Sequence, residues 1–99
     1  MPFHFDIEPV GGDLLLRVSG KLCKETFEDF RSALCRAQAQ GTRLIVDVDG
    51  VTTVDSCGLG MLLIAKEETH AEAISIRGAS PELKRLLEIV NFGQLFEIE

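Results

Sequence analysis

The chain has 99 residues, of which 45% are apolar and 26% are charged, and its formal net charge is −6. This length has room for one domain, and the apolar fraction is enough for a packed core, so wholesale disorder is excluded. The acidic balance argues against nucleic-acid binding and against adhesion to an anionic membrane, because both need clustered lysine and arginine. We expect a single folded domain over residues 1–99.

The three cysteines and the first ten residues predict that the protein is cytoplasmic. No apolar run approaches the roughly 18 residues that span a bilayer, and residues 1–10 carry acids where a secretory signal has a basic segment. Cys23, Cys35 and Cys57 are an odd number at wide spacing, without a CxxC pair. The simplest interpretation is three reduced thiols in a cytoplasmic protein with no metal site.

The first third of the chain predicts two strands and a helix. Residues 3–8 alternate apolar and polar side chains, which indicates a strand, and a second strand is expected at 14–18. A glycine turn at 11–13 joins them closely enough for a hairpin, and Gly20 is expected to end the second strand. From Thr26 to Gln40, apolar residues recur at steps of three and four, as on one face of a helix.

The middle of the chain predicts a core strand and a buried helix. Residues 43–49 form the strand, and the consecutive apolar residues at 44–46 indicate that both of its faces are covered. Asp49-Gly50 is typical of a turn, after which a short loop leads to Asp55. Residues 58–69 predict a helix whose first turns are almost wholly apolar.

The last third predicts a strand, a helix and a short final strand. Residues 73–77 alternate in the manner of a strand. Ser80-Pro81-Glu82 has a hydroxyl cap, a proline for the first helical position and an acid near the positive end of the dipole. That helix is expected to end at 91–93, before a strand at 95–98. The predicted order β-β-α-β-α-β-α-β is typical of an α/β fold, with helices packed on a mixed sheet.

One segment stands out as a candidate functional site: Val54-Asp55-Ser56-Cys57-Gly58-Leu59-Gly60. We expect Ser56 at or just before a helix start, where unpaired N–H groups and the dipole favour negative charge, including that of an added phosphate. Gly58 and Gly60 would leave the backbone uncovered, so that another surface approaches closely. Asp-Ser before a helix is also a common capping signature, and spacing alone favours that structural interpretation.

The whole chain, residues 1–99, resembles a STAS domain, specifically a bacterial anti-sigma factor antagonist. The segment from Asp55 to Gly60 is similar to the family's D-S-[S/T]-G-L-G, and it likewise follows a strand and a Val-x-x-Val-Asp stretch. Residues 80–87 resemble the last long helix of the family. Gly20-Lys21-Leu22 stands at the family's G-E-[I/L]-D segment.

The resemblance implies a non-enzymatic switch that binds proteins and is controlled by phosphorylation. In this family, a partner anti-sigma factor that is a serine kinase uses its own ATP to phosphorylate the serine after the aspartate, and a PP2C-type phosphatase reverses the reaction. The unmodified antagonist binds the anti-sigma factor and frees the sigma factor. That serine matches Ser56. The implied partner-binding residues are Asp55, Ser56, Cys57, Gly58, Leu59, Gly60 and Cys23, and no catalytic residue, cofactor or metal is expected on this chain.

Two departures from the family pattern bear on the partner. Cys57 replaces the usual serine or threonine after the phosphorylation site. Its thiol is either a plain small side chain or a redox-sensitive group at a helix start. Lys21 and Cys23 stand at positions where members often carry acids. Any contact that such acids make with the kinase in other members is therefore altered in this chain.

Two other functions stay open from the sequence. Some lone STAS domains are permanent adaptor subunits of larger assemblies, such as lipid-transport complexes, and phosphorylation would then be irrelevant. A small serine or thiol enzyme is a third reading, but its only candidate bases are His4 and His70, neither in a hydrolase motif.

Overall fold

A computed structural model describes residues 3–37, 43–69, 71, 73–94 and 96–99. The elements follow in the predicted order, with two short 3₁₀ turns added, so the expected α/β fold is confirmed. The strands are β1 (His4–Val10), β2 (Asp13–Leu22), β3 (Arg43–Val54), β4 (Ala73–Arg77) and β5 (Glu97–Ile98). The helices are α1 (Phe27–Ala37), α2 (Ser56–Thr69) and α3 (Pro81–Ile89), and the 3₁₀ turns are η1 (Lys24–Thr26) and η2 (Phe92–Gln94).

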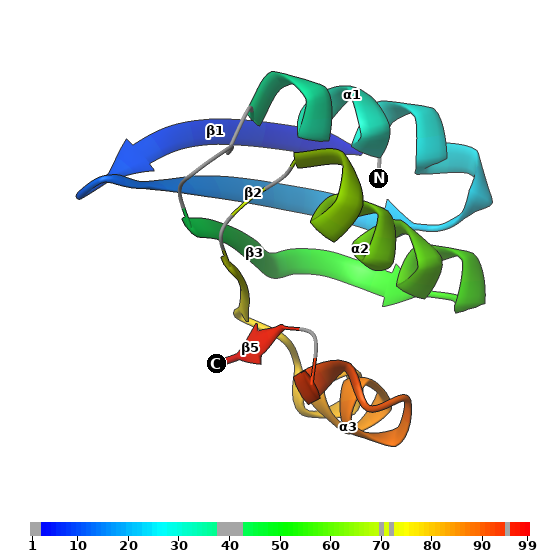
Figure 1. Cartoon of the computed structure of the whole chain (residues 1–99). Helices are drawn as coiled ribbons and strands as arrows, with labels where there is room; N and C mark the ends of the chain where they lie inside the picture. The colour runs from blue at the N-terminus through cyan, green and yellow to red at the C-terminus, as the bar shows by residue number, and fades with distance from the viewer. Residues whose placement is uncertain (1–2, 38–42, 70, 72, 95) are drawn as a thin grey trace.

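The strands form one mixed sheet in the order β1-β2-β3-β4-β5. β1 pairs antiparallel with β2, as the predicted hairpin requires, and all other neighbours pair in parallel. Helices α1 and α2 lie side by side over β2 and β3, whereas α3 lies beyond β3, near β5 (Figure 1). Because parallel strands end at the same edge of a sheet, the carboxyl ends of β2 and β3 lie together where α2 begins.

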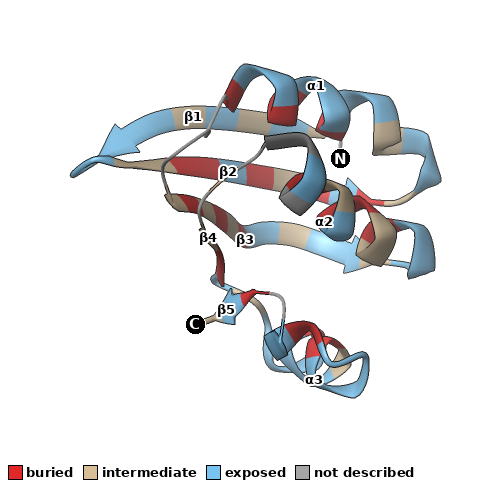
Figure 2. Ribbon diagram, in the orientation of Figure 1, coloured by how far each residue is buried: buried red, intermediate tan, exposed pale blue. Residues whose placement is uncertain are grey.

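The core fills the space between the sheet and the helices, mostly under α1 and α2 and with a contribution from α3 (Figure 2). Burying a large apolar side chain stabilises the fold by about 1.5–3 kcal/mol, so this layer fixes α2 firmly against β2 and β3. The largest fully buried side chains come from the sheet and from all three helices: Phe30, Leu16, Leu22, Leu34, Leu44, Met61, Leu62, Ile76 and Leu87.

The opposite face of the sheet carries several charged side chains beside the buried Leu15 and Ser75, and Ile45 is only half-buried there, so the prediction that the central strand is covered on both faces is wrong. Along β3, Leu44 is buried whereas Ile45 is only half-buried. Asp47 lies opposite Arg17 of β2 and Arg77 of β4, and its carboxylate is 3.3 Å from the Arg77 guanidinium. Burial alternates along the strand because helices pack on one face alone.

Two glycines that were expected to end or turn strands lie inside them. β2 continues through Gly20, and β3 continues through Gly50. A Cβ on Gly50 would lie 2.8 Å from the Cβ of Ser19, so the glycine permits β2 and β3 to approach closely where their pairing shifts register. The predicted turn at Asp49-Gly50 is therefore wrong, and the longer strands carry the chain directly to the start of α2.

Helix and strand ends agree with prediction in part. The hydroxyl of Ser80 accepts a hydrogen bond from the backbone N–H of Leu83 at 3.1 Å, which confirms the predicted cap of α3. The helix that was expected from Thr26 begins one residue later, at Phe27, and Thr26 belongs to η1. The expected end of α1 at Gln40-Gly41 lies outside the described residues. β5 is shorter than the predicted 95–98.

Candidate functional site

Ser56 is the first residue of α2, and it is exposed. This position agrees with the expectation that a helix begins at the motif. Among the residues that the structure describes, none hydrogen-bonds to the Ser56 hydroxyl. An enzyme arriving from solvent can therefore reach this oxygen without breaking an internal contact.

Asp55 caps α2. Its Oδ1 accepts a hydrogen bond from the backbone N–H of Gly58 at 2.8 Å, and its carbonyl accepts one from the N–H of Leu59 at 3.0 Å. An aspartate here satisfies an N–H that otherwise lacks a partner in the first turn. The capping interpretation is thus correct for Asp55, while the hydroxyl of Ser56 takes no part in the cap.

The two glycines of the motif have different surroundings. Gly58 is buried, and a Cβ there would lie 2.2 Å from the carbonyl oxygen of Leu22, at the end of β2. The expectation that Gly58 opens its backbone to another molecule is wrong, because β2 already occupies that space. Around Gly60, by contrast, a Cβ would meet no atom within 4 Å. Of these two glycines, Gly60 alone faces open space.

The segment after β2 lies against the start of α2. The backbone N–H of Asp55 donates to the carbonyl of Leu22 at 3.3 Å, which brings the next residue, Cys23, to the same edge. Thr26 holds this segment in shape, because its hydroxyl donates to the carbonyl of Lys21 at 2.6 Å and accepts from the N–H of Cys23 at 3.2 Å. The structure thus places Cys23 at the same edge of the sheet as the motif, and its role in partner binding stays a prediction.

The charges of this segment are mixed. A hydrogen bond with the Cys23 side chain lowers the pKa of the Glu25 carboxyl, and a backbone hydrogen bond and the cations Lys24 and Lys21 lower it further. The Glu25 carboxyl therefore stays ionised at neutral pH. Lys21 and Lys24 thus place two cations in this segment, and Lys21 stands at one of the two positions where the family resemblance leads one to expect acids.

An apolar groove of about 310 Å³ lies between η1, the start of α1 and the first turns of α2. Cys57, which follows Ser56 in the chain, is one of its walls. Sequence reasoning missed most of this groove, although the all-round apolar start of α2 was a signal that the core would not cover every side chain. The lining residues are Lys24, Phe27, Cys57, Gly60, Met61 and Ile64.

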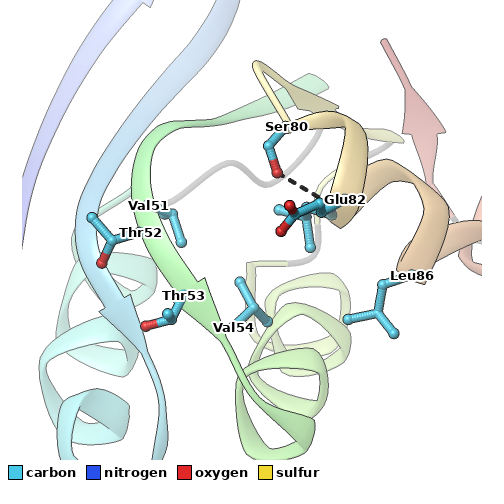
Figure 3. A pocket seen from close by; sticks show the side chains of 8 residues that line it. Val51, Thr52, Thr53, Val54, Ser80, Glu82 and Leu86 are labelled. Atoms are coloured by element: carbon cyan, nitrogen blue, oxygen red, sulfur yellow. Dashed lines mark hydrogen bonds between the residues drawn. The ribbon is translucent and has the colours of Figure 1, made fainter.

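A second hollow, of about 210 Å³, separates the end of β3 from the start of α3 (Figure 3). Its one ionisable lining residue is Glu82, and the Ser80 hydroxyl beside it already accepts the hydrogen bond that caps α3. The arrangement offers neither a nucleophile with a base nor a set of metal ligands. Its walls are Val51, Thr52, Thr53, Val54, Ser80, Glu82, Leu83 and Leu86.

The described residues add no support for an enzyme. Within them, no group of three or more histidine, cysteine or acidic side chains is placed to hold a metal ion, and all three cysteines are free thiols. His4 is exposed on β1, 3.5 Å from Asp6, and it lines a hollow with Arg17 and Asp47 of the polar sheet face. His70 lies outside the described residues. Across the same part of the chain, no helix combines the length and the apolar character needed to cross a membrane.

Comparison with known proteins decides the family. The family model described as STAS domain matches residues 4–99. The chain belongs to the STAS-domain family. This STAS domain is 37% identical over 90 residues to a STAS-domain containing protein of Pseudomonas aeruginosa (strain UCBPP-PA14), covering 89% of each chain. It is 27% identical over 95 residues to the anti-sigma F factor antagonist of Lysinibacillus sphaericus, covering 91% of this chain and 81% of the relative.

Solved structures share the fold of this STAS domain. An anti-sigma factor antagonist from Mycobacterium paratuberculosis matches with a TM-score of 0.79 at 20% identity, over 98% of this chain and 85% of that one. The anti-sigma factor antagonist SpoIIAA matches in its unphosphorylated form with a TM-score of 0.68 at 23% identity, over 97% of this chain and 87% of that one. Its phosphorylated form matches with a TM-score of 0.63 at 20% identity, over 97% and 91%. At these identities the likeness establishes the mixed α/β fold of the domain.

Proposed function

We propose that this STAS domain, spanning residues 1–99, is an anti-sigma factor antagonist that is switched by phosphorylation of Ser56. In its unmodified form it binds an anti-sigma factor that is also a serine kinase, and the sigma factor is released. The single observation that carries this proposal is the exposed, unengaged hydroxyl of Ser56 at the first position of α2. The distant similarity to an anti-sigma F factor antagonist supports it.

The reaction at Ser56 is a phosphoryl transfer that the partner performs. The Ser56 oxygen attacks the γ-phosphorus of ATP held by the kinase, ADP leaves, and the hydroxyl proton passes to a base of the kinase. This chain contributes the nucleophile and needs no cofactor of its own. A PP2C-type phosphatase hydrolyses the phosphate ester and restores the hydroxyl. Both enzymes act in the cytoplasm, where we place this protein.

The physical basis of the switch is local charge. A phosphate adds about −1.5 to −2 charge at neutral pH, on a chain that already carries −6. The start of α2 tolerates this charge, because the helix dipole is positive there. A partner surface that packs closely on Ser56 would then face an unpaired dianion and lose affinity by repulsion and desolvation. The fold itself does not need to change.

The surface that the partner covers surrounds Ser56. Asp55 and Cys57 flank the hydroxyl in the chain and are exposed, and Cys23 approaches from the end of β2. Gly60 adds open space one turn further along α2. Gly58 is buried and supports this surface only indirectly, by letting α2 pack against β2, and Leu59 is half-buried.

Phosphorylation mapping tests the proposal. Each anti-sigma factor kinase encoded in the source genome is incubated with this protein and ATP, and the phosphate is located by mass spectrometry. We expect one kinase to modify Ser56 and to leave Ser56→Ala unmodified. Ser32→Ala is the matched control, because Ser32 is an exposed serine on α1, away from the site. Phosphate at another residue, or none with any of these kinases, contradicts the proposal.

Partner binding separates the switch from a permanent adaptor. We expect Ser56→Ala to bind the kinase constitutively and Ser56→Asp to bind it weakly. Stable co-purification with a membrane transport complex, unchanged by Ser56→Asp, would instead assign the adaptor role.

A further inference from the structure

Two of the three cysteines lie at the same edge of the molecule, one on each side of the contact between β2 and α2. Cys23 directly follows Leu22, the last residue of β2, and Cys57 is the second residue of α2. Both are free thiols, of which Cys57 is exposed and Cys23 is half-buried. Neither belongs to the hydrophobic core, so neither sulfur is sealed inside the fold.

The backbone segments that carry these two cysteines are in contact. The N–H of Asp55 donates to the carbonyl of Leu22 at 3.3 Å. A Cβ built on Gly58 would lie 2.2 Å from that carbonyl oxygen and 2.9 Å from its carbon. Cys23 is bonded to this carbon, and Cys57 directly precedes Gly58. Each cysteine is therefore one residue, or about 3.8 Å between Cα atoms, from the contact, which suits the separation of about 4.4–6.8 Å between the Cα atoms of a disulfide.

The Cys57 side chain faces the segment that holds Cys23. It lines the apolar groove together with Lys24, the residue after Cys23. The Cys23 sulfur lies 4.0 Å from the hydroxyl oxygen of Thr26, in the same short turn, η1. None of the three residues of η1 is buried, so a small shift of this turn disturbs little packing. Side-chain rotation and a small movement of η1 are enough to bring the two sulfurs together.

We propose that Cys23 and Cys57 form a reversible intramolecular disulfide on exposure to a hydroperoxide. The thiolate of the exposed Cys57 attacks a peroxide oxygen, the O–O bond breaks, and the sulfur becomes a sulfenic acid. The Cys23 thiolate then attacks that sulfur, the S–O bond breaks, and the S–S bond forms. The two thiol protons join the two departing hydroxides, so two thiols are oxidised to one disulfide and hydrogen peroxide is reduced to two waters. A dithiol reductant reverses the step by exchange, as is usual for redox-sensing disulfides of the cytosol.

The disulfide acts on the neighbouring hydroxyl, and this consequence rests on the proposed function. Ser56 directly precedes Cys57, so the bridge ties the backbone that carries the hydroxyl to the end of β2. A kinase then meets an altered surface on both sides of its target oxygen. Oxidation should therefore slow the phosphorylation of Ser56.

Disulfide mapping tests the bridge without the kinase. The protein is treated with a stoichiometric amount of hydrogen peroxide, the remaining thiols are alkylated, and non-reduced tryptic peptides are identified by mass spectrometry. Trypsin places the three cysteines in separate peptides, 22–24, 32–36 and 44–66. We expect 22–24 to be linked to 44–66 in a yield that does not depend on protein concentration, and we expect dithiothreitol to release the link.

Single substitutions supply the controls. Cys23→Ser and Cys57→Ser should each abolish the linked peptide, whereas Cys35→Ser should leave it unchanged. Cys35 is the matched control because it is also an exposed thiol but lies in the last turn of α1. The inference is overturned by linkage through Cys35, by disulfide-linked dimers alone, by sulfinic acid at Cys57 with Cys23 still free, or by no oxidation at either residue.

The outcomes separate this inference from the proposed function. If the bridge forms but no kinase modifies Ser56, the redox pair stands and the switch falls. If a kinase modifies Ser56 but the bridge does not form, the inference falls and the switch stands. If both occur, the rate of Ser56 phosphorylation is compared between oxidised and reduced Cys35→Ser protein. A lower rate in the oxidised form supports redox control of the switch, and equal rates overturn it.

Discussion

In the first turn of α2, the inner side packs and caps the helix, whereas the outer side is exposed and makes no internal contact with the described residues through the Ser56 hydroxyl. On the inner side, Asp55 caps the helix and Gly58 packs against the carbonyl of Leu22. On the outer side, Ser56 is exposed with an unengaged hydroxyl, and Gly60 faces open space. One short motif therefore combines a structural half with a half left available to a partner. The structural interpretation of the motif is correct for Asp55 and Gly58, whereas the functional interpretation stays a prediction for Ser56 and Gly60.

Replacing the inner glycine should have the largest effect. In Gly58→Ala the new methyl group would lie 2.2 Å from the Leu22 carbonyl oxygen, and backbone on both sides resists moving. We expect a loss of about 3 kcal/mol in the free energy of unfolding, at the upper end for overpacked sites, measured by urea denaturation. Gly60→Ala is the control and should stabilise the helix by about 0.5–1 kcal/mol. Equal free energies of unfolding for Gly58→Ala and Gly60→Ala would contradict the claim that only the inner side of the turn is closely packed.

Removing the cap should have the next largest effect. Asp55→Ala leaves the Gly58 N–H without its acceptor, so the free energy of unfolding should fall by about 1 kcal/mol. Asp55→Asn is expected to retain most of that stability, because asparagine caps as well as aspartate. If the kinase modifies Asp55→Asn as fast as the unaltered protein, the role of Asp55 is the cap alone. A slower reaction at full stability would show that its charge also matters to the kinase.

Substitutions of Ser56 should change the free energy of unfolding only slightly, and Ser56→Asp should raise it rather than lower it. Ser56→Asp places a negative charge at the positive end of α2 and should stabilise the protein by about 0.3–1 kcal/mol. Ser56→Ala should stay within about 0.5 kcal/mol of the unaltered protein. Thermal denaturation at low salt measures both. A clear loss of stability in Ser56→Ala would mean that the hydroxyl serves the fold.

The smallest effect is expected at Cys57. Cys57→Ser restores the residue type of the family motif at an exposed position, so stability should change by less than about 0.5 kcal/mol. Kinase binding by the reduced protein should also be unchanged. Loss of binding by the unaltered protein after mild oxidation, but not by Cys57→Ser, would instead show that the thiol is a redox sensor.

Local patterns in the sequence were enough to predict the order of the elements. The cap at Ser80 and the helix start at the motif follow from short-range chemistry, and both are present. The prediction of a turn at Gly50 is wrong because this glycine instead makes room for the neighbouring strand β2. The residue of β2 that lies against it, Ser19, is 31 residues away in sequence, so no local pattern could reveal the contact. The groove was missed for the same reason, since Phe27 and Ile64 meet only after α1 and α2 pack together.

The affinity of the cognate kinase for the two forms of this protein tests the central claim most directly. Isothermal titration calorimetry would compare the unmodified protein with protein phosphorylated at Ser56, with Ser56→Ala as the reference for loss of the hydroxyl. We predict that phosphorylation weakens binding at least about tenfold, equivalent to about 1.4 kcal/mol, while Ser56→Ala binds like the unmodified protein. Equal affinities of the phosphorylated and unmodified forms would contradict the account.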